Sequence, residues 1–281
     1  MINIFHKCDV LDGLKAIQNE TVDIIIADPP YNIGKQFNDY HDNLELSQYL
    51  VWCDKWIGEC IRILKPTGSM FVYGYSEILA HISVRIDLQK RWLIWSYTNR
   101  VVPSYNGWQR SHESIIYAHK GNPIFNKDLV RIPYSKTFLK NSVGKKRKGS
   151  ATSRFGSSSD TTYNAHENGA LPRDVINIST LAGGAGRERY FLHGDTVYPA
   201  SKIKDFDVKD CLKHPTQKPF ELTRRLIKSC KPSSGLVVIP FGGSGSEGVI
   251  ARELGLDFIG FEIDENYIKL ANGALKLYEK V

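Results

Sequence analysis

The sequence predicts an α/β fold with a doubly wound, Rossmann-like mixed sheet, and three observations support this class. Strand-like and helix-like patterns alternate through the first 125 residues, which is typical of wound sheets. The run Val22–Ala27 is rich in β-branched residues and is followed by an aspartate and two prolines, as expected for a buried strand. A second apolar run at 235–240 passes directly into a glycine turn and a helix, an order that wound sheets use at their ligand-binding edge.

The first half of the chain is expected to open with a strand at 2–5 and a short helix that begins at Asp9. The polar loop at 32–43, after the strand at 22–27, is either a mobile cover for a site or an ordinary surface connection. Apolar residues at helical spacing then predict a long helix over 44–64, which the Lys65–Gly68 segment is expected to end. The remaining elements are a strand at 69–73, a helix at 76–88 and strands at 92–97 and 112–118.

The second half resumes this alternation after a polar insertion. A helix is expected directly after Pro219, with Leu222 and Leu226 on its inner face. It is followed by a strand at 235–240, a helix at 249–254, a strand at 257–262 and a last helix at 264–279. The glycine-rich stretch at 181–186 precedes no clear strand and helix, so we interpret it as a loop.

Composition limits the classes of protein that the chain can belong to. Hydrophobic residues make up 42% and charged residues 24%, as in soluble globular proteins. No apolar run reaches eighteen residues and the N-terminus lacks a signal-peptide pattern, so we expect a cytoplasmic protein without a membrane partner. The five cysteines are scattered without a CxxC pair, which favours reduced thiols over a disulfide scaffold or a metal site. The formal net charge of +7 suits a polyanionic partner without identifying it.

The tetrapeptide Asp28-Pro29-Pro30-Tyr31 follows the strand at 22–27. Two prolines fix the backbone, so the carboxylate and the phenol ring are held at the carboxyl end of a strand. An exocyclic amino group on a base is a poor nucleophile, because its lone pair is delocalised into the ring. Asp28 and a backbone carbonyl of Asp28 or Pro29 could each accept one amino proton, while Tyr31 stacks on the base. The tetrapeptide thus predicts a methyltransferase acting on amino groups; the alternative is a turn in which Asp28 only caps a loop.

The turn Phe241–Gly248 lies between the strand at 235–240 and the next helix. Glycines let the backbone approach a ligand closely, and the helix N-terminus presents free N–H groups. Glu262 ends the next strand, where a carboxylate can accept hydrogen bonds from a ribose diol. The turn has no Walker lysine, so a nucleoside without transferable phosphates is the better ligand. Asp9 is either a helix cap or a second ligand at this edge.

A basic insertion separates the two halves. Residues 138–170 are rich in Ser, Gly, Asn, Lys and Arg and contain few aliphatic residues. Its basic residues include Lys145, Lys146, Arg147, Lys148 and Arg154. Interleaved basic and aromatic side chains fit a nucleic-acid clamp that contacts phosphates. The alternative is a solvated loop.

Together these motifs resemble the β class of S-adenosylmethionine-dependent DNA amino-methyltransferases, the restriction-modification type. In that class the catalytic tetrapeptide comes first, a target-recognition region follows and the cofactor motif comes last. The resemblance covers roughly residues 1–125 and 210–281. It implies a class I methyltransferase fold in circularly permuted order, with a catalytic half at 1–125, a DNA-binding target-recognition insertion at 126–210 and a cofactor-binding half at 211–281.

The resemblance also implies roles for individual residues. Asp28, Pro29, Pro30 and Tyr31 would hold a flipped base and its amino group. The residues implied for S-adenosyl-L-methionine are Asp9, Asp28, Thr216, Lys218, Phe241, Gly242, Gly243, Ser244, Gly245, Glu247 and Glu262. The family usually carries Asp where this chain has Ile239, next to the ammonium group of the cofactor. Our hypothesis is that Glu247 compensates.

The expected activity is site-specific methylation of the N6 amino group of a flipped adenine in duplex DNA, without a metal. N4-cytosine methylation is the alternative within the class, although cytosine enzymes more often carry Ser at the position of Asp28. A protein-glutamine methyltransferase usually has Asn there. A non-catalytic nucleic-acid-binding module is the alternative from another class. Family members often pair as homodimers and can have a cognate restriction endonuclease; the sequence itself shows neither partner.

Overall fold

The structure is a computed structural model of the 281-residue chain. It describes all residues except 38–39, 100–105, 150–151, 153–158, 206 and 280–281. The described residues form two compact units. The larger unit comprises Met1–Phe125 and Asp174–Val281, and the smaller unit comprises Asn126–Arg173.

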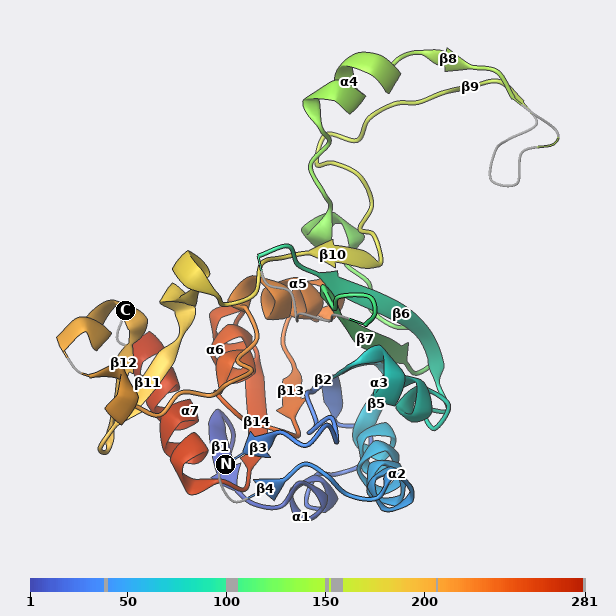
Figure 1. Ribbon diagram of the computed structural model, residues 1–281. Helices are drawn as coiled ribbons and strands as arrows, with labels where there is room; N and C mark the ends of the chain where they lie inside the picture. The colour runs from blue at the N-terminus through green and yellow to red at the C-terminus, as the bar shows by residue number, and fades with distance from the viewer. Residues whose placement is uncertain (38–39, 100–105, 150–151, 153–158, 206, 280–281) are drawn as a thin grey trace. The chain divides into compact units, whose positions relative to one another are not determined.

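One sheet organises the larger unit (Figure 1). Among the described residues it has eight strands, in the order β1-β14-β13-β2-β5-β7-β6-β10. The strands are β1 (Ile4–Lys7), β14 (Asp257–Glu262), β13 (Leu236–Ile239), β2 (Val22–Ala27), β5 (Leu64–Gly74), β7 (His112–His119), β6 (Gln89–Ser96) and β10 (Val175–Asn177). The strands from β1 to β5 are parallel, whereas β7 is antiparallel to both of its neighbours. The mixed sheet predicted from the sequence is therefore confirmed.

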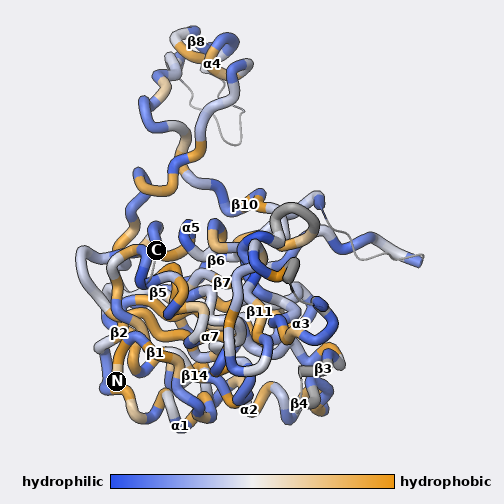
Figure 2. The backbone as a smooth tube through the Cα atoms, turned by 90° about the vertical axis from the view of Figure 1, so that its left-hand side faces the viewer, coloured by the Kyte–Doolittle hydropathy of each residue, from blue (hydrophilic) through white to orange (hydrophobic). Residues whose placement is uncertain are grey.

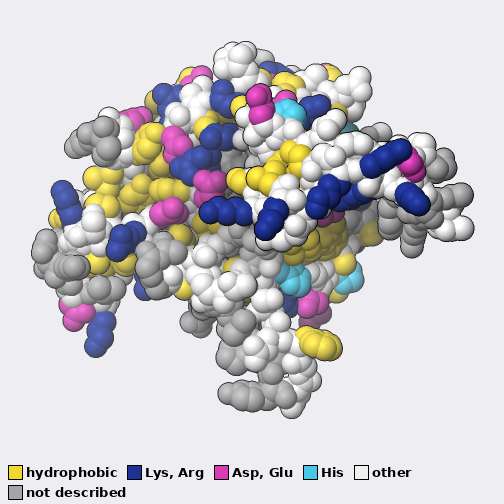
Figure 3. Space-filling view, turned by 90° about the horizontal axis from the view of Figure 1, so that it is seen from above, with side chains coloured by type: hydrophobic (Ala, Val, Ile, Leu, Met, Phe, Trp, Pro, Cys, Tyr) yellow, Lys and Arg dark blue, Asp and Glu magenta, His cyan; other side chains and the backbone are white. Residues whose placement is uncertain are grey.

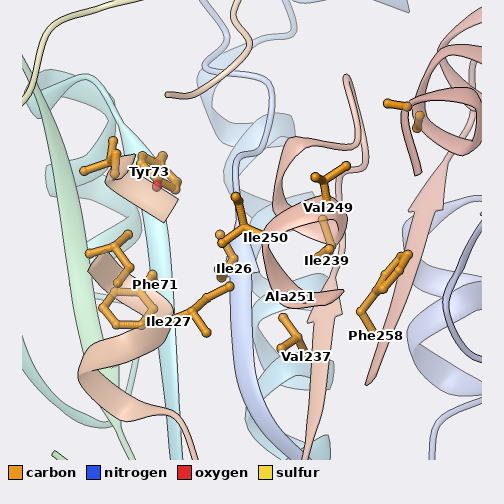
Figure 4. Packing of buried hydrophobic residues seen from close by; sticks show 14 of the residues in the cluster. Ile26, Phe71, Tyr73, Ile227, Val237, Ile239, Val249, Ile250, Ala251 and Phe258 are labelled. Atoms are coloured by element: carbon orange, nitrogen blue, oxygen red, sulfur yellow. The ribbon is translucent and has the colours of Figure 1, made fainter. Parts of the chain in front are cut away.

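Helices cover both faces of the sheet. One face carries α1 (Val10–Lys15), α2 (Leu46–Ile63) and α3 (Ser76–Ser83), and the other carries α5 (Phe220–Cys230), α6 (Ser246–Glu253) and α7 (Glu265–Tyr278). The alternation along β2 shows the two layers, because Ile24 and Ile26 pack in one core cluster and Ile25 and Ala27 in the other. In Figure 4 the side chains of Ile26 and Ile239 point toward α6. This arrangement is the doubly wound architecture.

The core is concentrated in the central strands. All six residues of β2 are buried, and hydrophobic positions gather along the strands of the larger unit in Figure 2. A strand buried on both faces needs an almost continuous apolar sequence, which explains why the bounds of β2 and β14 match those expected from the sequence.

Two helix starts are fixed by aspartate side chains. The Asp9 carboxylate accepts a hydrogen bond from the backbone N–H of Leu11 at the start of α1. Asp264 caps α7 in the same way, through Asn266 and Tyr267. The expected helix starts are confirmed at these two positions.

Several predicted boundaries are wrong, and the two largest differences concern β5 and α3. Strand β5 begins at Leu64, so Lys65–Gly68 continues the sheet instead of forming a turn after α2. Lys65 donates to the buried Asp23 carboxylate at 2.8 and 2.9 Å, and this ion pair holds the start of β5 beside β2. Helix α3 ends at Ser83 rather than at residue 88.

Residues 174–210 belong to the larger unit, although the sequence assigned 126–210 to one insertion. Strand β10 pairs with β6, and a hairpin of β11 (Tyr190–His193) and β12 (Thr196–Pro199) lies beside α7 (Figure 1). The structural boundary of the insertion therefore falls near residue 173. The assignment of 126–210 to target recognition stays a prediction. The remaining short elements of this unit are β3 (Gln36–Phe37), β4 (Tyr40–His41), η2 (Gly183–Glu188), η3 (Ala200–Asp205) and η4 (Val208–Asp210).

The smaller unit is built from η1 (Lys127–Val130), α4 (Lys136–Ser142), β8 (Lys146–Arg147) and β9 (Thr161–Thr162). Three aromatic rings form its centre: Tyr134 stacks on Phe138, and both contact Tyr163 edge-on. An isolated bridge between Ile132 and Ala170 closes its base.

Within the described part of the chain, no helix combines the length and the apolar character needed to cross a membrane. The described residues also contain no group of three or more His, Cys, Asp or Glu side chains that could hold a metal ion.

Candidate active site

The carboxyl ends of the parallel strands meet at one edge of the sheet, where a cavity of about 570 Å³ opens. The register explains this, because Lys7 pairs with Glu262 and Ala27 pairs with Val72 at the ends of their strands. All predicted catalytic and cofactor-binding residues line this cavity except Gly245. Tyr31 and Phe241, more than two hundred positions apart in the chain, thus face the same space.

The Asp28 carboxylate lies in a buried hydrogen-bond network. Its Oδ2 accepts from the Lys218 ammonium at 2.6 Å, and its Oδ1 accepts from the Tyr31 hydroxyl at 2.7 Å. The Lys218 side chain is only 3% exposed. Burial opposes its charge, but the neighbouring Asp28 and Glu113 carboxylates outweigh burial and raise the pKa of Lys218 above its ordinary value. Lys218 therefore stays charged and orients Asp28.

Tyr31 is held as a neutral phenol. Burial, and then the Asp28 and Glu113 charges, raise the pKa of Tyr31 well above its ordinary value. The ring of Tyr75 contacts Tyr31 edge-on at 5.2 Å between centroids. The turn that carries Tyr31 is fixed from behind, because the Tyr49 hydroxyl donates to the Pro30 carbonyl at 2.7 Å. These contacts give the tetrapeptide one defined conformation.

The glycine turn after β13 brings bare backbone to the cavity. Gly243 and Gly245 have φ values of +48° and +78°, in the left-handed region that favours glycine. A Cβ at Gly243 would come 3.0 Å from His214 Nε2, and one at Gly245 would come 2.7 Å from Ala271 Cα. Gly245 is the residue that starts α6, so it shapes the turn without lining the cavity.

Aromatic side chains support the start of this turn. Phe241 contacts both Trp52 and Trp56, with ring centroids at 5.7 and 5.6 Å. Phe241 and Trp52 both line the cavity. The wall on this side is therefore apolar and rigid.

Glu262 ends β14 with its carboxylate tied to backbone N–H groups. Its Oε2 accepts from Gly243 at 2.8 Å, and its Oε1 accepts from Ile263 and Asp264 at 2.9 Å each. Burial raises the pKa of Glu262, although these hydrogen bonds oppose the increase. A carboxylate fixed in this way keeps lone pairs for the hydroxyl groups of a ligand.

Glu247 is buried at the start of α6 and lines the cavity. Its Oε2 accepts from the Ser246 hydroxyl at 2.8 Å. Burial, and then the charge of Asp28, raise the pKa of Glu247 to about 7. The charge of this side chain can therefore change near neutral pH.

Two other predicted residues, Asp9 and Thr216, also line the cavity. Asp9 is a helix cap and also lines the cavity, so the alternatives of cap and ligand are compatible. Thr216 lines the cavity together with Lys218.

Sequence reasoning assigned no role to several cavity residues, and Glu113, Tyr75 and His214 are three of them. Tyr75 follows the end of β5, and Glu113 lies at the same edge because β7 is antiparallel to β5, so the start of β7 meets the end of β5. The His112-Glu113 pair before a strand was the available signal, but it gave no direction for that strand. His214 also lines the cavity, and burial lowers the pKa of this imidazole to about 3.

The predicted DNA-binding residues Lys145–Lys148 lie in the smaller unit and are exposed. Lys146 pairs with Asp160 at 3.3 Å within that unit. Arg154 lies outside the described residues. Several groups of Lys and Arg side chains gather on the face of the molecule shown in Figure 3.

The fold is similar to the folds of solved DNA methyltransferases. The chain is similar to the PvuII DNA methyltransferase (cytosine-N4-specific), with a TM-score of 0.64 and 16% identity over 96% of this chain and 85% of that chain. It is also similar to a complex of M1.HpyAVI with SAM, with a TM-score of 0.59 and 19% identity over 98% of this chain and 99% of that chain.

Sequence comparison agrees with the structures. The DNA adenine methyltransferase YhdJ of Escherichia coli is 30% identical over 93% of this chain and 79% of its own length. The type II methyltransferase M.HpaI of Haemophilus parainfluenzae is 26% identical over 95% of this chain and 72% of its own length. The model of the DNA methylase family that covers N6 and N4 methyltransferases matches residues 22–273. The chain therefore belongs to this family of DNA amino-methyltransferases.

Proposed function

We propose that this DNA methylase transfers a methyl group from S-adenosyl-L-methionine to the N6 amino group of an adenine flipped out of duplex DNA. The observation that carries the proposal is that Asp28–Tyr31 and the glycine turn after β13 line the same cavity. The carboxylate that would accept a hydrogen bond from the amino group and the turn that would bind the nucleoside are thereby close enough to serve one reaction.

The residues of the cavity fit S-adenosylmethionine as the cofactor. A volume of about 570 Å³ is within the range of ligand sites, roughly 300–1,000 Å³. The fixed Glu262 carboxylate suits a ribose diol, and the bare backbone at Gly243 permits a close approach. Glu247 would face the positively charged part of the cofactor, in place of the Asp that the family has at Ile239. When bound, the cofactor supplies an electrophilic methyl group.

The side chains around Asp28 prepare the amino group of the base. Lys218 and Tyr31 fix both carboxylate oxygens, and each oxygen keeps a lone pair for an amino proton. Accepting a proton by hydrogen bond shifts the amino nitrogen toward a tetrahedral shape and frees its lone pair. The Tyr31 ring would stack on the flipped base, which offsets part of the few kcal/mol that flipping costs.

The smaller unit carries the charge needed for phosphate contacts. Residues 126–173 contain ten Lys or Arg and three Asp or Glu, a formal net charge of +7 that equals that of the whole chain. The larger unit is thus formally neutral. This distribution supports Lys145–Lys148 as contacts to the DNA backbone, with Arg154 added from the sequence.

Adenine and cytosine present amino groups of similar geometry, and two relatives support different targets. Asp28 and the name of the 30%-identical relative, an adenine methyltransferase, favour N6-adenine. The PvuII structure, a cytosine-N4 enzyme, is the observation that favours the second candidate.

The decisive experiment supplies duplex DNA and methyl-labelled S-adenosylmethionine to the protein and identifies the labelled nucleoside by mass spectrometry. N6-methyladenine is expected, whereas N4-methylcytosine would support the second candidate. Asp28→Ala should abolish transfer while the cofactor still binds, and Asp12→Asn, which changes an exposed carboxylate on α1, is the control. Substantial transfer by Asp28→Ala, or no label in DNA at all, would refute the proposal.

Two partner assignments also stay proposals. Relatives such as M.HpaI are named type II methyltransferases, which supports a cognate restriction endonuclease. Restriction of unmethylated host DNA by the products of the neighbouring genes would test it. A homodimer would be detected by sedimentation of the purified protein.

A further inference from the structure

We propose that Glu113 is a positioning residue for methyl transfer: it shares the Lys218 ammonium with Asp28, so that the Asp28 carboxylate keeps its strength as a hydrogen-bond acceptor. This inference rests on the proposed function, because it concerns how the site prepares the amino group. It gives a role to a residue that the sequence motifs left without one.

The strand direction brings Glu113 to the site. Strand β7 begins with His112 and Glu113, and its residue Ser114 pairs with Gly74 at the carboxyl end of β5. The Glu113 side chain is 16% exposed and lines the cavity beside Asp28. A carboxylate in such a partly desolvated position is costly unless it has a partner.

Lys218 is that partner, and it has two carboxylates. Its Nζ lies 2.6 Å from Asp28 Oδ2 and 3.6 Å from Glu113 Oε2. The Tyr31 hydroxyl joins the same group, 2.7 Å from Asp28 Oδ1 and 3.1 Å from Glu113 Oε2. A phenol has a single proton, so it can donate to only one of these carboxylates at a time.

The charge count explains why the second carboxylate matters. An isolated Asp28–Lys218 pair would be neutral, and the ammonium would draw electron density from the only acceptor. With Glu113 ionised, one positive charge serves two negative charges, and the group of three keeps a net charge of −1. Glu247 is the third carboxylate near Lys218, and because burial raises its pKa to about 7, it is only partly charged at neutral pH. Glu113 is therefore the second carboxylate that shares the Lys218 ammonium with Asp28.

The test separates a positioning role from a structural one through kcat and the dissociation constant of the cofactor. Glu113→Gln keeps the shape of the side chain and removes its charge. We expect kcat for DNA methylation to fall at least tenfold, while the dissociation constant for S-adenosylmethionine, measured by calorimetry without DNA, changes less than twofold. Glu113→Asp, which keeps the charge, should recover part of the loss.

Glu77→Gln is the matched control, since Glu77 also forms an ion pair, with Arg110 at 2.8 Å. Activity of Glu113→Gln within twofold of wild type would overturn the inference.

A second measurement needs no activity. In the cofactor-free protein, Glu113→Gln and Lys218→Met should be coupled in a double-mutant cycle of unfolding. Each substitution changes the unfolding equilibrium constant by some factor. The factor for the double variant should differ at least fivefold from the product of the factors for the two single variants. If wild type methylates no DNA, the proposed function fails and this cycle alone decides whether Glu113 and Lys218 act together. Independent effects of the two substitutions would refute the shared ammonium.

Discussion

The Lys218 ammonium lies 2.6 Å from the Asp28 carboxylate, although the two residues are 190 positions apart in the chain. One belongs to the segment before α5 and the other to the turn after β2. The ion pair therefore joins the parts of the chain on either side of the basic insertion. If Asp28 accepts the amino proton as proposed, its orientation depends on Lys218, a residue that the family resemblance assigned to the cofactor.

Lys218→Met should lower both stability and activity. Breaking a buried ion pair leaves the Asp28 and Glu113 charges uncompensated, and such changes typically cost about 3–5 kcal/mol. Chemical denaturation measures the loss of stability, and methyl transfer by the folded fraction measures the loss of activity. Lys65→Met is the control, because Lys65 pairs with the largely buried Asp23 at the opposite end of β2. It should destabilise the protein and leave kcat of the folded fraction unchanged; equal losses of kcat in both variants would contradict a specific role of Lys218.

Much of the fold could be predicted from local patterns, and particular residues show why. Asp9 and Asp264 start helices by accepting backbone hydrogen bonds, and the apolar run of β2 could only be buried. The direction of β7 could not be predicted, because the apolar pattern of a strand does not show whether it runs parallel or antiparallel to its neighbours. Glu113 was therefore not predicted at this edge of the sheet, whereas Asp28 and Phe241 follow parallel strands and line the cavity as expected.

Gly245→Ala should destabilise the protein at the start of α6 by more than the cost of placing alanine in a left-handed conformation. A Cβ at this position would come 2.7 Å from Ala271 Cα on α7, so backbone must move. The matched control is Gly255→Ala, which has φ of +71° and no atom within 4 Å of its Cβ position. The control should lose only about 1–2 kcal/mol. Gly245→Ala should lose more and also weaken cofactor binding; equal stability of the two variants by denaturation would show that the turn adapts.

Glu247→Gln should change how stability depends on pH. The folded protein raises the pKa of Glu247 to about 7, so the folded state binds more protons than the unfolded state between pH 4.5 and 7. This contribution to stability is fully present below pH 4.5 and is lost as pH rises through 7, by about 3 kcal/mol in total. Glutamine does not ionise, so the variant should gain stability relative to wild type between pH 5 and 8. Chemical denaturation of both proteins at pH 5 and pH 8 measures the two free energies of unfolding. The lowered pKa of His214 has the opposite effect on stability, but His214 is present in both proteins, so its contribution cancels in the comparison.

The same variant tests the role of Glu247 toward the cofactor. If the Glu247 carboxylate faces a positive charge of the ligand, affinity of wild type for S-adenosylmethionine should increase from pH 6 to pH 8. Affinity of Glu247→Gln should be lower and independent of pH in this range. Calorimetry measures both, and unchanged affinity in the variant would show that Glu247 does not replace the missing Asp at position 239.

The boundary of the insertion shows a second limit of sequence reasoning. The glycine-rich stretch at 181–186 precedes no clear strand and helix in the sequence, so the prediction groups residues 174–210 with the basic segment before them. In the structure they add β10 to the sheet and place a hairpin beside α7. These contacts are long-range, through Val197 against Gly273 for example, and no local pattern encodes them. Charge separates the segments better, since the excess of Lys and Arg ends at residue 173.

Replacing Lys145, Lys146, Arg147 and Lys148 by Gln should weaken DNA binding without changing cofactor binding. If these side chains bind phosphates, the decrease in affinity is similar for all DNA sequences, because phosphates carry no sequence information. The slope of log affinity against log salt should become shallower by about 0.9 for each phosphate that the variant no longer neutralises. Fluorescence titration of duplex DNA at several salt concentrations measures this slope. The control replaces four exposed lysines of the larger unit, Lys15, Lys55, Lys209 and Lys276. A control that flattened the slope as much would show that overall charge, and not the smaller unit, holds the DNA.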